Sequence, residues 1–111
     1  KAVFLLTQSY YEGLIRYGVK IYEYTPGFVH GKCFVSDDKI ATVGTINTDY
    51  RSLYLHFECG TYFFESPVVA QVKRDFLETQ EKSRQITERD CTPGFWKGLF
   101  QMVLRVFAPL L

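Results

Sequence analysis

Two neighbouring runs of β-forming residues constrain this chain more than any other feature of its sequence. The runs are Phe28 to Ser36 and Lys39 to Thr45, and only Asp37 and Asp38 separate them. So short a connection is typical of a tight turn, and aspartate tolerates the backbone conformations that such turns require. The segment therefore predicts two neighbouring strands that pair in antiparallel fashion.

The residues before this pair predict a strand, a helix and a second strand. Ala2 to Leu6 is a short continuous apolar run, typical of a strand covered on both faces. Helix-spaced apolar side chains follow within Ser9 to Tyr17, and Gly18 can end that helix. A strand from Val19 to Tyr24 then leads into the turn signal Thr-Pro-Gly.

The residues after the pair predict a loop, a further strand and a long helix. Asn47 to Ser52 is polar and predicts a loop, and Leu55 to Phe64 is rich in aromatic residues and predicts a strand. Ser66 and Pro67 are typical of the N-cap and the first helical position. The helix that they begin is expected to run to about Ile86.

The end of the chain predicts a connector and a terminal helix. Thr87 to Thr92 is polar, and residues 93–111 predict an amphipathic helix that Pro109 ends. The favoured interpretation of its apolar stripe is packing against the domain or another domain, and the second is contact with a membrane interface. The stripe consists of Trp96, Phe100, Val103, Leu104 and Phe107.

The order of these elements predicts the fold class α/β. Four or five strands interleaved with three helices indicate a mixed β-sheet sandwiched by helices. The 47% hydrophobic content of the 111 residues is enough for a core, so we expect residues 1–111 to form a single domain.

Charge and cysteine content exclude several classes of protein. Thirteen basic and twelve acidic side chains give a net charge of +1, which does not favour nucleic acid as a partner. The three cysteines, Cys33, Cys59 and Cys91, are odd in number and widely spaced, which argues against a disulfide framework or a structural zinc site. We expect a reducing compartment, with Cys33 and Cys59 buried as small apolar residues.

The beginning of the chain indicates a piece of a larger protein. It starts at Lys1 with no signal peptide, and no stretch is long enough to cross a bilayer.

His30 and Lys32 form the first candidate site. They are two residues apart in a predicted strand, so both side chains are expected on one side of it. An imidazole beside a fixed positive charge suits nucleophilic attack on a phosphate ester, or proton donation to it. Asp37 closes the motif at the end of the strand.

Polar residues further along the chain extend this candidate site. Gly44 permits close approach of the backbone, and Thr45 and Asn47 supply neutral donors for phosphate oxygens. Glu58 on the next predicted strand is placed to return to His30, where a carboxylate would fix the imidazole tautomer. His56, by contrast, is interpreted as an ordinary polar strand residue outside the site.

In combination these motifs resemble a known superfamily. The pattern His30-x-Lys32-x4-Asp37 followed by Gly44-Thr45-x-Asn47 is similar to the signature of the phospholipase D superfamily. The resemblance extends over nearly the whole chain and is greatest to the C-terminal half of the bacterial cardiolipin synthases. The residues that carry this wider resemblance are Gly18 to His30, Asn47-x-Asp49-x-Arg51-Ser52 and Phe57-Glu58.

The resemblance implies a fold, a reaction and a set of roles. The fold is a phospholipase D-like half-domain, and the reaction passes a phosphatidyl group through a phosphohistidine to a second phosphatidylglycerol, giving cardiolipin and glycerol. His30 is expected to act as acid and then base, and Glu58 to orient it. Lys32, Thr45 and Asn47 are expected to bind the phosphate, while Asp37 belongs to the catalytic motif in a mainly structural role.

The same resemblance implies partners and a location. The first His/Lys/Asp motif of the family is absent from these residues, so the N-terminal half of the enzyme is an expected partner and the isolated chain is expected to be inactive. Two copies meeting at their His30 strands, a homodimer, would also supply a second histidine. The intact enzyme is expected on the cytoplasmic side of the bacterial cell membrane, with no metal and no cofactor.

Two other functions use the same residues differently. A phospholipase D-type phosphodiesterase, either a hydrolase or a nuclease, would pass the phosphoryl group to water or cut a nucleic acid with identical motif residues. The weak net charge argues against the nuclease. A non-catalytic module with a vestigial motif, which binds a membrane or a partner, is the alternative from another class.

Overall fold

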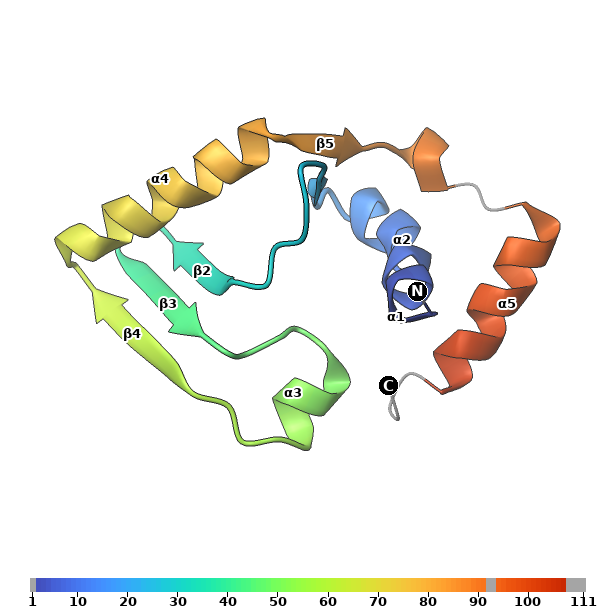
Figure 1. The fold of residues 1–111 in the computed structure, drawn as a ribbon, viewed down its shortest axis with the longest axis horizontal. Helices are drawn as coiled ribbons and strands as arrows, with labels where there is room; N and C mark the ends of the chain where they lie inside the picture. Colours follow the sequence, from blue (N-terminus) through green and yellow to red (C-terminus); the bar gives the residue numbers. More distant parts are fainter. Residues whose placement is uncertain (1, 92–93, 108–111) are drawn as a thin grey trace. The chain divides into compact units, whose positions relative to one another are not determined.

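The computed structural model describes residues 2–91 and 94–107 of the chain, and these contain both helices and strands (Figure 1). The predicted α/β class is confirmed by these helices and small sheets. The chain divides into two compact units. Tyr24–Arg84 is called the sheet unit here, and Lys1–Glu23 with Gln85–Leu111 is called the terminal unit.

The sheet unit is built on three antiparallel strands in the order in which they occur along the chain. These are β2 (Lys32–Ser36), β3 (Ile40–Gly44) and β4 (Gly60–Phe64). The predicted pairing of β2 with β3 is confirmed, with Ser36 opposite Ile40 at the turn. Pairing of β3 with β4 extends the sheet by one strand.

The turn between β2 and β3 forms as the sequence indicates. Asp37 and Asp38 have φ angles of 52° and 57°, and the amide of Lys39 donates to the carbonyl of Ser36 at 3.0 Å. Two successive left-handed residues define a type I′ turn, whose twist matches that of the paired strands. Aspartate adopts this conformation at low cost, so the local sequence fixes the register of the hairpin.

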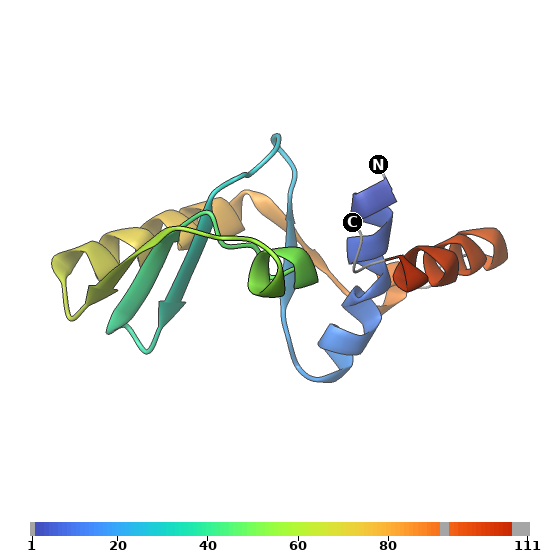
Figure 2. The ribbon, with the colours of Figure 1, turned by 90° about the horizontal axis from the view of Figure 1, so that it is seen from below.

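Helix α4 (Pro67–Glu81) provides the core of the sheet unit. Its predicted beginning is confirmed, because the Ser66 hydroxyl accepts a hydrogen bond from the amide of Val68 at 3.3 Å. The helix runs beside all three strands (Figures 1 and 2). Val69 on the helix is 2% exposed and Ala41 on β3 is fully buried, so the helix and the sheet meet around these two side chains.

Two predicted strands are shorter than the sequence indicates. β2 begins at Lys32, so Phe28 to Gly31 lie outside it, because β3 ends at Gly44 and leaves those residues no strand to pair with. The predicted strand from Leu55 begins only at Gly60. Part of the predicted polar loop is instead a short helix, α3 (Tyr50–Tyr54), with Leu55 as its C-cap.

The predicted end of α4 is also wrong by several residues. The helix ends at Glu81, and β5 (Ser83–Ile86) pairs with β1 (Ile21–Tyr24) in a second, two-stranded sheet. The hydroxyl of Thr25 donates to the carbonyl of Lys82 at 3.0 Å, just beyond the helix. Strand pairing and burial of Ile86 at 5% exposure therefore override the helical pattern of this segment.

The terminal unit contains helices from both ends of the chain. The run Ala2 to Leu6, predicted as a strand, lies in helix α1 (Ala2–Ser9). A short apolar run does not distinguish a strand from a helix by its periodicity. The hydroxyls of Thr7 and Ser9 donate to the carbonyls of Val3 and Leu6, which is compatible with a helix.

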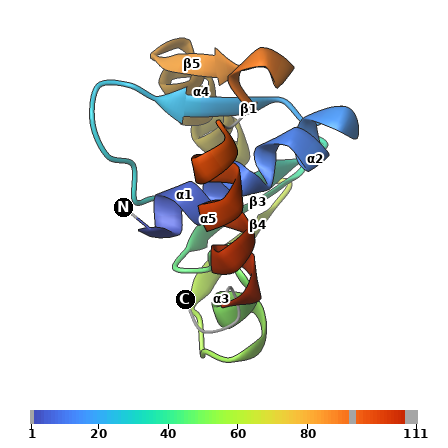
Figure 3. The same cartoon turned by 90° about the vertical axis from the view of Figure 1, so that its right-hand side faces the viewer.

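The remaining helices of this unit follow the prediction more closely. α2 (Tyr11–Arg16) lies within the predicted helix, and the predicted connector contains a short 3₁₀ helix, η1 (Glu88–Cys91). The predicted terminal helix is α5 (Phe95–Val106), which packs against α1 (Figure 3). Pro93 and Pro109 lie outside the described residues.

The prediction that Cys33 and Cys59 are buried is wrong, because both side chains are exposed. Cys33 is paired with Val43, which is 42% exposed, whereas the next pair on the same face includes the fully buried Ala41. Burial under α4 therefore ends between these two pairs. Cys59 precedes β4 and lies beyond the end of the sheet.

Gly44 allows the close approach of β3 and β4, and we expect Gly44→Ala to destabilise the chain. A Cβ at this position would lie 2.5 Å from the Cα of Gly60, and closer still to the carbonyl oxygen of Cys59. Both obstacles are backbone atoms, so the strands would have to separate, and a cost of about 2 kcal/mol or more is expected. Urea denaturation of the two proteins measures the difference.

Gly31→Ala is the matched control, since a Cβ there would meet no atom within 4 Å. We expect its free energy of unfolding to stay within about 0.5 kcal/mol of the parent. Equal losses for the two variants would contradict the steric argument.

Candidate active site

The strand register gathers most of the predicted site residues at one end of the three-stranded sheet. Lys32 is paired with Gly44, and Gly44 is paired with Gly60, so these three positions form a row across the sheet. Thr45 follows Gly44 directly, and Glu58 lies two residues before Gly60. Residues from three separate parts of the chain therefore meet at the end of the sheet that is remote from the Asp37 turn.

Lys32 and His30 are in direct contact at this end. The Nζ atom of Lys32 lies 3.0 Å from Nδ1 and 3.1 Å from Nε2 of the His30 ring, and it donates to the His30 carbonyl at 2.7 Å. The ring is exposed and stacks on Phe28, with 5.8 Å between the ring centroids. His30 lies before the strand rather than in it, yet the expected juxtaposition of imidazole and ammonium is present.

This contact fixes the roles of the atoms involved. An ammonium group only donates hydrogen bonds, so the imidazole nitrogen bonded to it acts as the acceptor. The lysine is itself half-buried, and its bond to the His30 carbonyl holds the ammonium against the ring. The pair presents an exposed titratable ring with the ammonium of Lys32 beside it.

Thr45 and Glu58 form a second contact next to this pair. The Thr45 hydroxyl donates to Oε2 of Glu58 at 2.5 Å, and it accepts a hydrogen bond from the amide of Cys59 at 3.0 Å. The amide of Thr45 donates to the carbonyl of Cys59 at 2.9 Å. These bonds continue the pairing of the two chain segments past the end of the β3–β4 ladder, which fixes Glu58 relative to Thr45.

Ser52 joins Asn47 to the same carboxylate. The side-chain amide of Asn47 donates to the Ser52 hydroxyl at 3.2 Å, and that hydroxyl is hydrogen-bonded to Glu58. Ser52 is held by α3, because its amide donates to Oδ1 of Asp49, the N-cap of this helix, at 2.7 Å. We call Thr45, Asn47, Ser52 and Glu58 the Glu58 cluster.

The hydroxyls of the Glu58 cluster keep its carboxylate ionised. The hydrogen bond from Thr45 has the largest effect and that from Ser52 the next, and together they lower the pKa of Glu58 below the ordinary value of a glutamate. Among the described residues no hydrogen bond joins Glu58 to His30. The predicted orienting contact is therefore not formed here, although both residues lie at the same end of the sheet.

Asp37 is the one predicted site residue that the structure places elsewhere. It lies in the β2–β3 turn, where Oδ2 accepts a hydrogen bond from the Ser36 hydroxyl at 2.9 Å. A strand rises about 3.3 Å per residue, so the turn is about 16 Å from Lys32. Its position agrees with the structural part of the role expected for it.

Sequence reasoning gave Ser52 no role, although the residue lies in the polar segment that it singled out. Asp49 is a favourable N-cap residue, which is a local signal for the start of α3, but it does not indicate the contact of the Ser52 side chain with Glu58. His56 lies outside any strand and accepts a hydrogen bond from Nε of Arg51 at 2.5 Å. It is exposed, and its charge interaction with Glu58 helps to lower the pKa of that carboxyl, after the hydrogen bonds from Thr45 and Ser52.

The arrangement offers an ammonium and a side-chain amide as donors, one exposed imidazole, and one carboxylate to which two hydroxyls donate. Donors of this kind bind the oxygens of an anionic ester, and the imidazole can move a proton. Within residues 2–91 and 94–107, no group of three or more histidine, cysteine, aspartate or glutamate side chains is arranged to hold a metal ion. No helix in the same ranges is both long and apolar enough to cross a membrane.

Comparison with known proteins points to one family. Residues 2–80 match the family described as "Cardiolipin synthase, PLD-like domain". The whole chain is 38% identical to a protein of Geobacillus kaustophilus and 35% identical to one of Halalkalibacterium halodurans, both named "Cardiolipin synthase". It is also 47% identical over its whole length to an "Uncharacterized protein" of Streptococcus mutans.

The chain spans only part of these relatives. It covers 22% of the length of the two named synthases and 24% of the Streptococcus mutans protein, and it matches the C-terminal part of the synthases. No solved structure gives a significant match. The family match covers well over half of the chain, which therefore belongs to the phospholipase D-like domain family of the cardiolipin synthases.

Proposed function

We propose that this chain supplies one histidine of a phosphatidyltransferase site that converts two phosphatidylglycerol molecules into cardiolipin and glycerol. The observation that carries the proposal is the contact of the Lys32 ammonium with the exposed His30 ring at 3.0 Å. The Glu58 cluster at the same end of the sheet supports it, because that cluster adds neutral donors and an anion.

The reaction divides into two displacements at phosphorus. In the first, a histidine of the other motif attacks phosphatidylglycerol, the bond from phosphorus to the glycerol oxygen breaks, and His30 in its protonated form gives the leaving oxygen a proton. The Lys32 ammonium then bonds to the phosphate rather than to the ring, because an imidazolium nitrogen cannot accept a hydrogen bond. In the second, His30 takes a proton from the hydroxyl of another phosphatidylglycerol. That oxygen attacks the phosphohistidine, which releases the first histidine and forms cardiolipin.

The phosphate oxygens need donors on this side of the site. Lys32 supplies a point charge beside His30, and its half-buried position limits how far the ammonium can move. The Asn47 amide donates one N–H to Ser52 and keeps a second N–H for the phosphate. The Thr45 hydroxyl donates its hydrogen to Glu58 and would have to turn from that carboxylate to bind the phosphate. Donors that are fixed before substrate binds need little reorganisation in the transition state.

Glu58 is proposed to orient His30. Its lowered pKa keeps it anionic near neutral pH, and an anion accepts an imidazole N–H readily. The contact requires a rotation of either side chain from its position in this structure. Thr45 and Ser52 would then act as positioning residues, since they hold the carboxylate toward the end of the sheet.

The partner of this half-site is proposed to be the N-terminal part of the same enzyme. The sequence has only two histidines, and His56 is followed by Phe57 and Glu58 rather than by the lysine of an H-x-K motif. The named synthases are more than four times longer than this chain, which leaves room for a second motif. We propose the cytoplasmic surface of the cell membrane as the location of the intact enzyme, which a lipid substrate supports.

In the full-length enzyme, we expect His30→Ala to lower cardiolipin formation from phosphatidylglycerol at least about a hundredfold. This is the low end of the effect of losing a general acid. Mass spectrometry of the lipid products measures it, and it distinguishes cardiolipin from the phosphatidic acid that a hydrolase would make. His56→Ala is the comparison variant, because this exposed histidine bonds to Arg51 rather than to His30 or Lys32, and a much smaller loss of turnover is expected.

A second prediction concerns the ionisation of Glu58. Because its folded pKa is lowered, its contribution to stability is present above the unfolded pKa and is lost as pH falls through the folded pKa. Thr45→Val removes the main hydrogen bond and should raise the pKa of Glu58 toward the ordinary glutamate value. Thr45→Ser keeps the hydroxyl and should leave it low. NMR titration of the Glu58 carboxyl in the parent and the two variants measures the three pKa values. Equal pKa values in Thr45→Val and Thr45→Ser would contradict the role given to the Thr45 hydroxyl.

The chain alone should form no cardiolipin. An in-line displacement needs a nucleophile on one side of the phosphorus and an acid on the other, and one histidine cannot serve as both. Incubating the chain with phosphatidylglycerol vesicles, with sedimentation to establish its oligomeric state, tests this expectation. Turnover confined to a dimer would show that a second copy, rather than the N-terminal part, can supply the other histidine.

A further inference from the structure

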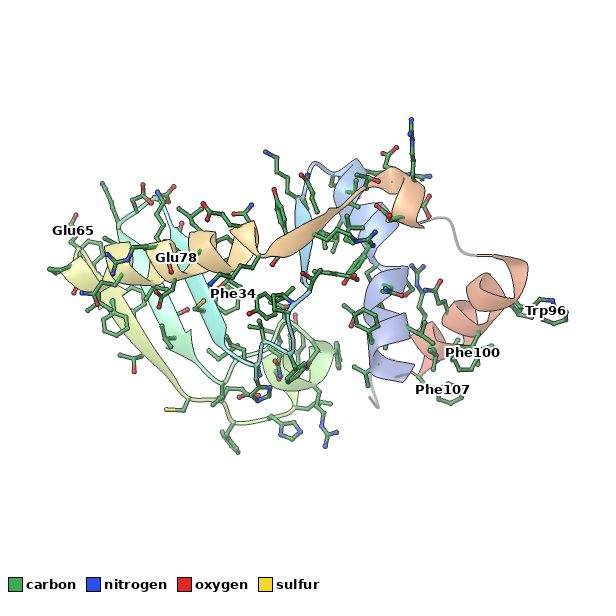
Figure 4. The ribbon with its side chains drawn as sticks, turned by 45° about the horizontal axis from the view of Figure 1, so that its top comes forward. Phe34, Glu65, Glu78, Trp96, Phe100 and Phe107 are labelled. Atoms are coloured by element: carbon green, nitrogen blue, oxygen red, sulfur yellow. The ribbon has the colours of Figure 1, made fainter. Side chains whose placement is uncertain are left out.

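Arg51 lies beside the Glu58 cluster and is held there from two sides. It precedes Ser52 on α3, and its Nε donates to Nε2 of His56 at 2.5 Å. His56 in turn precedes Glu58 by two residues, on the segment that leads into β4. In Figure 4, α3 lies at the end of the sheet remote from the labelled Glu65, which is the end that carries the candidate site.

The guanidinium of Arg51 keeps its charge and most of its donors. Arginine carries five N–H donors and stays protonated, and one of these donors is used on the His56 ring. Within residues 2–91 and 94–107 the ion pairs join other side chains, Arg16 to Glu12 and Lys73 to Asp38. Arg51 is exposed, so its remaining donors are open to a ligand.

The proposed reaction brings a second phosphate to this end of the sheet. The phosphatidylglycerol that acts as acceptor has its own phosphodiester, and only a glycerol unit separates it from the attacking hydroxyl. This phosphate and the one being transferred are both anionic, so they repel each other at close range. Lys32 and Asn47 are already assigned to the transferred phosphate, and a further cation beside them would offset the repulsion.

We propose that Arg51 binds the phosphate of the acceptor lipid and so determines which acceptor the site prefers. The planar guanidinium matches two phosphate oxygens with paired N–H donors. Its position fits this role, because Asn47 donates to the hydroxyl of Ser52, the residue that follows Arg51. The two phosphates are then bound by side chains that share Ser52 as a neighbour. The inference rests on the proposed function, whose acceptor it identifies by the phosphate.

Arg51 acts in the second displacement, when the acceptor attacks. In this step the N–P bond of the phosphohistidine breaks, a bond from phosphorus to the acceptor oxygen forms, and His30 takes the proton of the acceptor hydroxyl. Glycerol and water can also supply that hydroxyl, but neither has a phosphate for Arg51 to bind. Arg51 therefore favours the lipid over these acceptors and leaves the first displacement unchanged.

The experiment offers the full-length enzyme two acceptors at once. Vesicles of phosphatidylglycerol are incubated with labelled glycerol, so transfer to the lipid yields cardiolipin and transfer to glycerol yields labelled phosphatidylglycerol. We expect Arg51→Gln to lower the rate of cardiolipin formation about tenfold, the effect of one lost charged contact with a phosphate. Formation of labelled phosphatidylglycerol should be unchanged. Arg51→Lys keeps the charge and should recover part of the loss.

Arg74→Gln is the matched control. Arg74 is also an exposed arginine of the sheet unit, and it lines a hollow with Asp38, which lies in the β2–β3 turn at the other end of the sheet. This variant removes the same charge without changing the candidate site, so both products should form as in the parent. Circular dichroism checks that each variant folds.

Two results would overturn the inference. One is an equal loss of cardiolipin and of labelled phosphatidylglycerol in Arg51→Gln, which would give Arg51 a structural role or a role in the first displacement. The other is unchanged formation of both products in that variant. Parent rates of both products in His30→Ala would instead refute the proposed function itself, which Arg51→Gln does not test.

Discussion

The row of paired residues at one end of the three-stranded sheet determines everything else about the candidate site. Lys32, Gly44 and Gly60 lie opposite one another on neighbouring strands. Because Gly44 has no side chain, β3 can lie close to the backbone of Cys59 and Gly60. A shift of the register by one residue would move Lys32 away from this row and turn it to the other face. The type I′ turn at the far end prevents such a shift, so Asp37 contributes to the site through the register.

The Glu58 cluster shows how a carboxylate can be kept charged on an exposed surface. The hydroxyls of Thr45 and Ser52 donate to Glu58. The Thr45 hydroxyl also accepts a hydrogen bond from the amide of Cys59, and the amide of Ser52 donates to Asp49, the N-cap of α3. A charged acceptor with fixed donors has a defined position even without burial. A carboxylate held in this way can accept a further hydrogen bond, and the imidazole of His30 at the same end of the sheet is a candidate donor.

The sequence predicted best where a local signal determines the structure. The aspartate pair of the turn and the Ser66 cap have one favourable local arrangement each, and both formed as predicted. Ala2 to Leu6 became a helix because nothing local distinguishes a short apolar strand from a helix, and the choice depended on contact with α5. The lengths of β2 and β4 depend on how far the partner strand β3 extends, and the β-propensity of a segment carries no information about its partner.

The same reasoning explains which parts of the site could be predicted. Only Gly31 separates His30 from Lys32, so their spacing was informative even though His30 lies outside the strand. The role of Ser52 depends on three segments meeting, and no pairwise spacing contains it.

Helix α5 marks a further boundary of sequence reasoning. Its periodicity reveals two faces, but a periodic pattern assumes that the apolar face points inward. Gln101 and Arg105 reverse that assumption, because their side chains donate to the carbonyl of Leu5 and the hydroxyl of Ser9 on α1. Specific polar contacts thus set the direction of the helix, while side chains of its apolar side such as Phe100 and Val103 stay about half exposed.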